Sequence, residues 1–344
     1  MPRQITLRDI GRGLGLSAMT VSLALRDSPR ISDATKKRVR AATRGMNFEP
    51  NQLARALATG RSNLIGVIVP NSSDLYYAEV IRAIEDSASA LQYHVLLCNG
   101  SYRMETYTAR VRDMRRLHMK GIVAAPPFVS EKPRLPQFWK DLLKSDCEIV
   151  LINRQLDPPV FHQVAADYMG GVALVAQALA ERGHRRVAYI SGHPAVLPFR
   201  QRLRTFQRCV RDYGFEQDEA LYDSGELTCA GGYAACKRLW AANPRKPTAI
   251  VASSDTMAVG VLRYLDEAGI AVPGQVSIVS FDGTPFADFT HRSLSTVVTP
   301  MYEVGRRAFE MLLAAMKGQA PEPRSLVLPV ELRLRESLGP APAA

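Results

Sequence analysis

The sequence predicts an α/β protein, in which a small all-helical N-terminal domain precedes two doubly wound subdomains with parallel sheets. Three observations support this fold class. Residues 6–46 contain three short helical patterns with capping residues. From residue 64 onward, short apolar runs alternate with longer helical patterns, which is typical of parallel sheets covered by helices. These runs form two successive series, which indicates two sheets with a cleft between them.

The N-terminal segment divides into three short helices. Thr6 precedes the first as a hydroxyl N-cap, and Asp9 places an acid in its first turn. Gly15 supplies the turn that follows, where a residue without a Cβ is favoured. Ser17 caps the second helix and Ser32 caps the third. Apolar residues at helical spacing give the three helices an inward face: Leu7, Ile10 and Leu14, then Val21, Ala24 and Leu25, then Val39 and Ala42.

A helix, a glycine-containing turn and a second helix form the pattern of a helix-turn-helix motif, whose second helix lies in the DNA major groove. The exposed face of that helix carries five residues, namely Ser17, Ala18, Met19, Ser22 and Leu23. The pattern alone also allows a three-helix bundle with a solvated basic face. It further allows Leu23 to turn inward, with Thr20 or Arg26 reading the bases.

Four motifs make this segment resemble the N-terminus of LacI/GalR-family transcriptional regulators. They are T-L-x-D-I from Thr6, G-L-S-x-x-T-V-S from Gly15, I-S-x-x-T from Ile31 and P-N-x-x-A-R-A-L from Pro50. The resemblance implies a hinge helix over residues 51–57, with Leu57 wedged into the minor groove; a plain linker is the alternative. The DNA contacts implied in this way are Thr6, Ser17, Ala18, Met19, Thr20, Ser22, Leu23, Arg26, Arg30, Ser32, Thr35, Asn51, Ala54, Arg55 and Leu57.

The formal net charge of +11 is unevenly distributed along the chain. Residues 1–60 carry +7, and the rest of the chain carries +4. A basic end on a nearly balanced body is typical of a nucleic-acid-binding module joined to another domain. Charge without a motif can also be merely solubilising.

The five cysteines are scattered and form no C-x-x-C pair, so they predict small core residues in a reducing compartment and neither a metal site nor a cofactor. They are Cys98, Cys147, Cys209, Cys229 and Cys236. No apolar run reaches transmembrane length, and the N-terminus lacks the apolar core of a signal peptide. We therefore expect a cytoplasmic, nucleoid-associated protein without a membrane partner.

The body of the chain contains the two βα series. The first has expected strands at 64–69, 95–98, 121–124 and 149–152, with helices at 77–91 and 106–118. The second has expected strands at 187–190, 220–222, 249–252 and 277–280, with helices at 170–182, 202–213, 231–241 and 256–268.

The resemblance implies a periplasmic-binding-protein-like fold, in which the chain crosses between the subdomains more than once. We expect a helix-turn-helix domain at 1–48, a hinge helix and linker at 49–62, and an effector-binding and dimerisation domain at 63–338. Within the latter, the first subdomain comprises about 63–163 and 292–325, and the second about 164–291 and 326–338. Residues 339–344 form an expected disordered tail.

In open α/β sheets, ligands bind beyond the carboxyl ends of the strands. These positions carry carboxylates, amides, arginines and aromatic rings, a combination that suits a polyhydroxylated ligand. Residue by residue, the resemblance implies the effector contacts Tyr76, Tyr77, Asn153, Arg154, Arg202, Leu227, Ser254, Asp255 and Asp282. The alternative for Asp255 and Asp282 is that they cap the following helix or turn. The alternative for Tyr76 and Tyr77 is that they are core aromatics.

The sequence departs from the family pattern at three positions. Thr205 stands at the glycine of an R-x-x-G-F motif, and Gly283 replaces a carboxylate that often follows Asp282. Leu227 stands where several relatives place an aromatic side chain over the ligand. These departures indicate a ligand other than a typical hexose, or one that binds weakly.

The sequence does not favour an enzyme. The glycines at 11, 13 and 15 lack a preceding strand and the G-x-G-x-x-G spacing, and no Walker loop, nucleophile elbow or H-E-x-x-H motif is present. We expect a transcriptional repressor that binds a pseudo-palindromic operator as a homodimer or tetramer and responds to a sugar or sugar derivative. A sugar-binding transport receptor and a small-molecule enzyme on the same fold are the alternatives.

Overall fold

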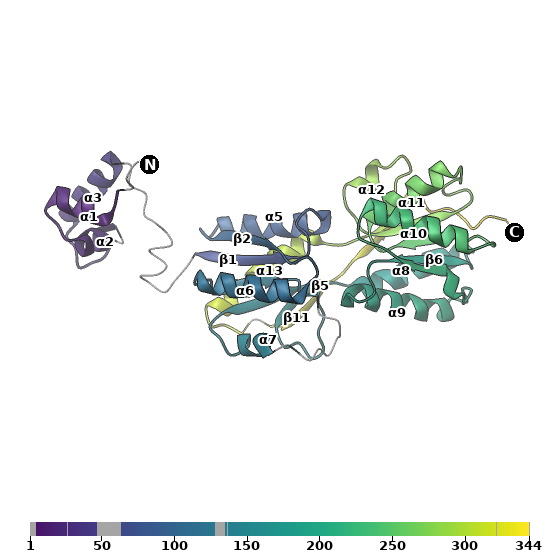
Figure 1. The fold of residues 1–344 in the computed structure, drawn as a ribbon, viewed down its shortest axis with the longest axis horizontal. Helices are drawn as coiled ribbons and strands as arrows, with labels where there is room; N and C mark the ends of the chain where they lie inside the picture. The colour runs from purple at the N-terminus through teal and green to yellow at the C-terminus, as the bar shows by residue number, and fades with distance from the viewer. Residues whose placement is uncertain are drawn as a thin grey trace. The chain divides into compact units, whose positions relative to one another are not determined.

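The computed structural model describes residues 5–25, 27–46, 63–127, 135, 137–320 and 322–343. The chain divides into two compact units, with the boundary between residues 62 and 63. This boundary coincides with the end of the linker expected from the sequence. Each unit is described by itself below (Figure 1).

The first unit contains α1 (Leu7–Leu14), α2 (Ala18–Leu25) and α3 (Asp33–Gly45). Thr6 and Asp9 form a capping box, because the Asp9 amide donates to the Thr6 hydroxyl at 3.3 Å and the Thr6 amide donates to the Asp9 carboxylate at 3.0 Å. Gly15 ends α1 with a φ of 67°, in the left-handed region that favours glycine. The three predicted helices are therefore confirmed.

The core of this unit is small, and among its described residues four apolar side chains are fully buried, those of Ile10, Val21, Ala24 and Val39. The backbone of α1 approaches the following turn closely at Gly11, where an added Cβ would lie 2.5 Å from the Leu16 carbonyl oxygen. This close approach lets the turn before α2 pack directly against α1.

The described part of the second unit contains two six-stranded sheets. The first has the order β11-β5-β4-β3-β1-β2, with β1 (Leu64–Val69), β2 (His94–Asn99), β3 (Gly121–Ala124), β4 (Glu148–Ile152), β5 (His162–Ala166) and β11 (Ser325–Leu328). The second has the order β12-β10-β9-β8-β6-β7, with β6 (Val187–Ser191), β7 (Tyr222–Ser224), β8 (Ala249–Ala252), β9 (Ser277–Asp282), β10 (Ser295–Val298) and β12 (Glu331–Arg333). All strand pairs between described residues are parallel except β10 with β12.

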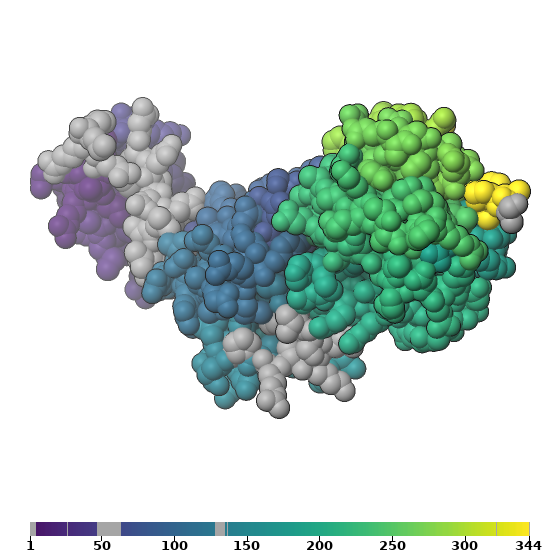
Figure 2. All heavy atoms as spheres, turned by 45° about the vertical axis from the view of Figure 1, so that its right-hand side comes forward, coloured from purple at the N-terminus to yellow at the C-terminus, as the bar shows by residue number. Residues whose placement is uncertain are grey.

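Helices cover both faces of each sheet, because the apolar side chains of successive strand residues point to opposite faces. The first sheet packs between α5 (Leu75–Ser89) with α13 (Met301–Met316) and α6 (Met104–Arg116) with α7 (Gln137–Leu142). The second packs between α8 (Tyr168–Glu181) with α9 (Leu197–Asp212) and α10 (Cys229–Ala242) with α11 (Asp255–Glu267). The short helices η1 (Glu219–Leu221) and α12 (Phe286–Phe289) lie in connecting segments. Figure 2 shows the surfaces of the two subdomains, in blue and green, meeting along a common border.

The chain crosses between the sheets three times, after β5, after β10 and after β11. The expected return to the first subdomain at residue 292 is therefore too early, since β10 belongs to the second sheet. The expected departure at residue 326 is also too early, since β11 continues to Leu328 in the first sheet. β10 begins with two buried hydroxyl residues, Ser295 and Thr296. Its sequence is therefore not a continuous apolar run, and the pattern did not predict a strand there.

Further differences from the prediction lie at element ends. Residues 219–221 form a 3-10 turn and the strand follows at 222–224, whereas the sequence predicted a strand at 220–222. α9 begins at Leu197, five residues before the predicted start, because a proline in the first helical turn needs no amide donor. Strands β5, β10, β11 and β12 were not predicted.

The C-terminal residues 339–343 are ordered, contrary to the expected disordered tail. The Gly339 amide donates to the Ser277 hydroxyl at 3.1 Å, and the Ala341 amide donates to the Arg182 carbonyl at 2.8 Å. These bonds tie the tail to the second subdomain. In the described part of the chain, no helix is long and apolar enough to cross a membrane.

Candidate functional site

Helix α2 presents the face that the sequence predicts for DNA. The Ser17 hydroxyl caps it by accepting a hydrogen bond from the Thr20 amide at 3.0 Å. Met19 is 70% exposed, while Val21 and Ala24 lie in the core. Leu23 is half-buried and is not among the residues that pack on that core. The apolar side chains of Met19 and Leu23 are therefore available on the outer side of the helix.

The turn after α2 is held by ion pairs with α3. Asp27 has a φ of 57°, and its carboxylate lies 3.0 Å from the Arg40 guanidinium and 3.4 Å from the Lys36 ammonium. The hydrogen bond from Lys36 and the charge of Arg40 lower the pKa of Asp27. These contacts hold the end of α2 against α3, so that a rigid unit presents the α2 face.

The remaining predicted DNA contacts include two helix caps, an exposed arginine and five residues that the structure does not describe. The hydroxyl of Ser32 accepts the Thr35 amide at 3.3 Å as the N-cap of α3, and Arg30 is exposed. Thr6 serves in the capping box described above. Five predicted contacts lie outside the described residues, namely Arg26, Asn51, Ala54, Arg55 and Leu57.

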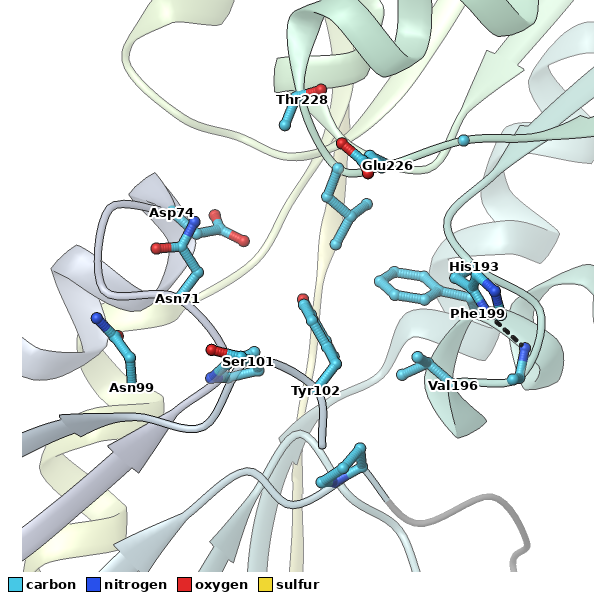
Figure 3. Close-up of a pocket in the computed structure, with 15 residues that line it drawn as sticks. Asn71, Asp74, Asn99, Ser101, Tyr102, His193, Val196, Phe199, Glu226 and Thr228 are labelled. Carbon is cyan, nitrogen blue, oxygen red and sulfur yellow. Dashed lines mark hydrogen bonds between the residues drawn. The ribbon is translucent and has the colours of Figure 1, made fainter. Parts of the chain in front are cut away.

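The second unit contains a cavity of about 600 Å³ between its two sheets. Its walls come from both subdomains, beyond the carboxyl ends of β1, β2, β6 and β7 (Figure 3). The first subdomain supplies Pro70, Asn71, Asp74, Asn99, Ser101, Tyr102 and Pro127. The second supplies His193, Ala195, Val196, Phe199, Gly225, Glu226, Leu227 and Thr228. We call this cavity the cleft.

The polar groups on the first wall are fixed by local hydrogen bonds. Asp74 caps α5 by accepting the Tyr76 amide at 3.0 Å, and burial raises the pKa of Asp74. The side-chain oxygen of Asn99 accepts the Ser72 amide at 2.8 Å. The amide nitrogen of Asn99 donates to no other described residue, so this NH₂ group is free to bind a ligand.

Tyr102 is held in an unusual backbone conformation beside these groups. Both Ser101 and Tyr102 have positive φ values, 51° and 53°, which non-glycine residues rarely adopt. Figure 3 shows the Tyr102 ring projecting into the space between the two walls, across from Phe199. Two aromatic rings thus flank the cleft, one from each subdomain.

Of the nine predicted effector residues, only Leu227 lines the cleft among the described residues. Tyr76 and Tyr77 are buried, and the Tyr76 hydroxyl donates to the Asn153 side-chain oxygen at 2.7 Å. This burial agrees with the alternative that they are core aromatics, and their effector role stays a prediction. Arg154 is also buried, and its guanidinium donates to the backbone carbonyls of Pro126, Asn153 and Ala125.

Asp255 and Ser254 are fully engaged within the second subdomain. The Asp255 carboxylate accepts hydrogen bonds from Ser280 at 2.5 Å, from Thr296 at 2.7 Å, and from the amide and hydroxyl of Thr284 at 2.6 and 2.9 Å. Burial nevertheless raises the pKa of Asp255. Ser254 caps α11 by accepting the Met257 amide at 3.2 Å. Asp255 therefore acts as an internal anchor of three segments.

Arg202 and Asp282 are buried and are not among the described residues that line the cleft. Arg202 is 5% exposed and donates to the Ser253 carbonyl at 2.8 Å. Its guanidinium carbon lies 4.1 Å from the centre of the Tyr168 ring and 5.0 Å from that of Phe199. Burial raises the pKa of Asp282 well above its usual range, and the nearby Asp255 raises it further. Arg202 thus supports the cleft wall through Phe199.

Sequence reasoning missed most of the residues that line the cleft. They lie at or after the carboxyl ends of β2, β6 and β7, with Phe199 in the first turn of α9, and include Asn99, Ser101, Tyr102, His193, Val196, Phe199, Glu226 and Thr228. The signal that was present is their place after a strand, beyond its carboxyl end.

Comparisons with known proteins agree with both units. Residues 6–51 match the model of the bacterial regulatory proteins of the lacI family, and residues 176–338 match a periplasmic binding protein-like domain. Catabolite control protein A of Priestia megaterium is 27% identical over 97% of this chain and 99% of its own length. The HTH-type transcriptional repressor PurR of Vibrio cholerae is 27% identical over 97% of this chain and 98% of its own.

Solved structures show the same architecture. The lac repressor dimer bound to operator and the anti-inducer ONPF matches 97% of this chain and 99% of its own with a TM-score of 0.85; at 22% identity, it shows the fold alone. The complex of the transcriptional regulator CelR with cellobiose is 26% identical, with a TM-score of 0.72, over 97% of this chain and all of its own. The helix-turn-helix unit with its lacI-family match, the two-sheet unit with its periplasmic binding protein-like match and these full-length likenesses identify the chain as a ligand-responsive, DNA-binding transcriptional regulator that is similar over its length to the LacI/GalR regulators.

Proposed function

We propose that this protein is a transcriptional repressor that binds a pseudo-palindromic operator as a homodimer, and that an uncharged, sugar-like effector in the cleft controls this binding. The observation that carries the proposal is the cleft itself. Its volume of about 600 Å³ lies within the range of small-molecule sites. Its polar and aromatic groups come from both subdomains, so one ligand can contact both at once.

The lining chemistry favours a hydroxyl-rich ligand. Asp74, Glu226 and Asn99 offer carboxylate and amide groups that can each bind two neighbouring hydroxyls. Tyr102 and Phe199 offer flat apolar faces for the CH groups of a sugar ring. Among the described residues that line the cleft, there is no lysine or arginine to bind a phosphate or carboxylate. These features favour a neutral sugar or sugar derivative over an acidic one.

The link to DNA is a shift between two populations of the dimer. A ligand that contacts both subdomains stabilises the arrangement in which their walls lie closest, and it can shift DNA affinity only by its differential affinity for the two arrangements. Two symmetric copies of α2 would read two half-sites, which makes the operator pseudo-palindromic. We propose that this takes place in the cytoplasm and involves no catalytic step.

The names of relatives support these finer points. PurR of Vibrio cholerae is a transcriptional repressor, the lac repressor is solved as a dimer on its operator, and CelR is solved with the sugar cellobiose. Transferred to this chain, they favour repression, a dimer and a sugar ligand.

The experiment begins with selection of operator DNA from a random pool by the full-length protein. We expect two-fold symmetric sites, and asymmetric or unenriched sequences would contradict the proposal. A panel of neutral sugars, sugar acids and sugar phosphates is then screened by thermal shift and by operator gel shift. We expect only neutral members to change both readouts.

A pair of matched variants tests the cleft. Glu226 lines the cleft, whereas Glu219 is exposed in η1 outside it. Glu226→Gln should weaken binding of the active sugar about ten- to a hundredfold, since losing a hydrogen bond to a charged group costs roughly 1.5–3 kcal/mol. Glu219→Gln should leave the affinity unchanged. Equal affinity in the two variants would show that the effector binds elsewhere.

A further inference from the structure

A second groove, separate from the cleft, lies on the outer side of the second subdomain. Its volume is about 530 Å³, and α9 forms most of it beside the first turn of α8. The side chains that matter here are Gln201, Arg204, Thr205, Gln207, Arg208 and Arg211. We call this feature the α9 groove. In Figure 1, α8 and α9 run side by side along the lower face of the second subdomain.

The three arginines of the α9 groove share one face of the helix. Positions 204, 208 and 211 are spaced by four and three residues, which places their side chains in a row. All three are exposed. Like charges at this spacing destabilise a helix. The row of arginines therefore destabilises α9, and the fold itself does not require it.

The arginines of this row also lack acidic partners, unlike several arginines on other helices. Arg82 pairs with Glu79 at 2.8 Å, Arg263 with Glu267 at 2.6 Å, and Arg306 with Glu303 at 2.5 Å. Within the described part of the chain, Arg204, Arg208 and Arg211 form no ion pair. The facing helix α8 carries no acidic residue between its N-cap, Asp167, and Glu181 at its end, and α9 carries a single carboxylate, Asp212, after the row. The groove is thus a site of net positive charge.

Local contacts hold one of these groups in place. The Arg208 guanidinium donates to the Thr205 hydroxyl at 3.1 Å, and Thr205 is buried. Thr205 is the residue that departs from the glycine of the family motif. Gln201 and Gln207 add amide donors to the same groove. The lining therefore combines planar guanidinium groups with neutral donors and contains no carboxylate.

We propose that the α9 groove binds a small anion that carries two or more phosphate groups. Guanidinium groups bind phosphate oxygens through paired hydrogen bonds. The row from Arg204 to Arg211 spans seven residues, or about 10 Å along the axis, which suits two separated or linked phosphates. A hollow of about 530 Å³ has the size of a small-molecule site rather than of a flat interface.

Other occupants fit less well. A second copy of this chain would place the same arginines opposite one another in a symmetric contact, and like charges would repel. The cleft is lined by Asp74 and Glu226, so it is unsuited to phosphates and leaves that chemistry to the α9 groove. Because Phe199 on α9 lines the cleft, an anion in the groove binds the helix that forms the cleft wall.

The test uses inorganic pyrophosphate and tripolyphosphate with the full-length protein in low salt. Isothermal titration calorimetry compares the unmodified protein with the double variant Arg204→Gln/Arg208→Gln and with Arg115→Gln. Arg115 is the control, since it is exposed on α6 and has no ion pair among the described residues. We expect binding that falls at least about tenfold in the double variant and is unchanged in Arg115→Gln. Arg208→Lys keeps the charge but loses the planar guanidinium group that binds phosphate through paired hydrogen bonds. Its affinity for the anion should therefore lie between those of the unmodified protein and the double variant.

Three results would overturn the proposal. The first is no binding of either anion at millimolar concentration. The second is equal binding in all variants, which would place the anion on another basic surface. The third is a double variant with weakened operator affinity in the absence of pyrophosphate, which would show that this face contacts DNA. Far-ultraviolet circular dichroism and thermal unfolding of each variant check that the protein remains folded.

Discussion

Removing the Asp255 carboxylate tests whether this residue is an internal anchor or a ligand contact. Asp255→Ala leaves the Ser280, Thr296 and Thr284 donors without their acceptor. The two hydroxyls of Ser280 and Thr296 can turn toward other acceptors, but the buried Thr284 amide cannot. An unsatisfied buried donor costs roughly 1–3 kcal/mol, and each lost bond to a charged group a similar amount. We therefore expect a loss of about 4 kcal/mol in the free energy of unfolding.

This loss is large enough to measure. For a unit of this size, 1 kcal/mol corresponds to about 2–4 °C in melting temperature, so Asp255→Ala should melt roughly 10 °C lower. Asp255→Asn keeps one acceptor for Thr284 and can donate to the hydroxyls, so it should lose only about 1 kcal/mol. Asp266→Ala, at an exposed position of the same helix, is the control and should melt normally.

The assay combines thermal unfolding by circular dichroism with titration of the active sugar well below the melting temperature. Both Asp255 variants should bind the sugar as the unmodified protein does. An Asp255→Asn protein with normal melting and no sugar binding would refute the anchor interpretation. It would show instead that the carboxylate contacts the ligand.

Two further predictions concern base reading and pH. Leu23→Arg should move the preferred base at the facing half-site position from thymine toward guanine, since arginine binds guanine O6 and N7 while leucine packs on the thymine methyl; operator selection measures this, and a required guanine unchanged by the substitution would contradict it. His184 is buried, with its ring nitrogens 3.0 Å from the Thr248 hydroxyl and 3.1 Å from the Gly339 carbonyl, and burial lowers its pKa below 6.5. The unfolded chain then binds a proton more readily, so stability should fall as pH drops below about 6.5. Urea unfolding of His184→Gln should show a flatter decline over this range, and an identical decline would exclude His184 as its source.

Much of the fold follows from the sequence, because its strongest elements have local signals. The headpiece helices have capping residues at Thr6, Ser17 and Ser32, and β1 is a continuous apolar run. β10 could not be recognised in this way. It begins with Ser295 and Thr296, whose burial is compensated by hydrogen bonds to Arg335 and Asp255 that come from distant parts of the chain.

The position of the cleft could be predicted from the sequence, but the residues that line it could not. The rule that ligands bind beyond the carboxyl ends of strands placed it correctly. Which side chain after a strand faces the cleft depends on contacts made across the fold. Arg154, for example, does not line the cleft, because its guanidinium donates hydrogen bonds to the carbonyls of Ala125 and Pro126, which lie 29 and 28 residues earlier in the chain. No spacing pattern in the sequence marks those acceptors.

Two of the predicted effector residues that do not line the cleft, Tyr76 and Arg202, both contact Tyr168. The Tyr76 ring, from the first subdomain, lies 6.5 Å from the ring of Tyr168, which begins α8 just after the first crossing to the second. The Arg202 guanidinium carbon lies 4.1 Å from the centre of the Tyr168 ring and 5.0 Å from that of Phe199, which lines the cleft. A chain of aromatic and cation–π contacts therefore joins the two subdomains. Two of the residues expected to bind the effector, Tyr76 and Arg202, thus make contacts where the subdomains meet, which is where a change in the distance between the subdomains must be accommodated; their effector role stays a prediction.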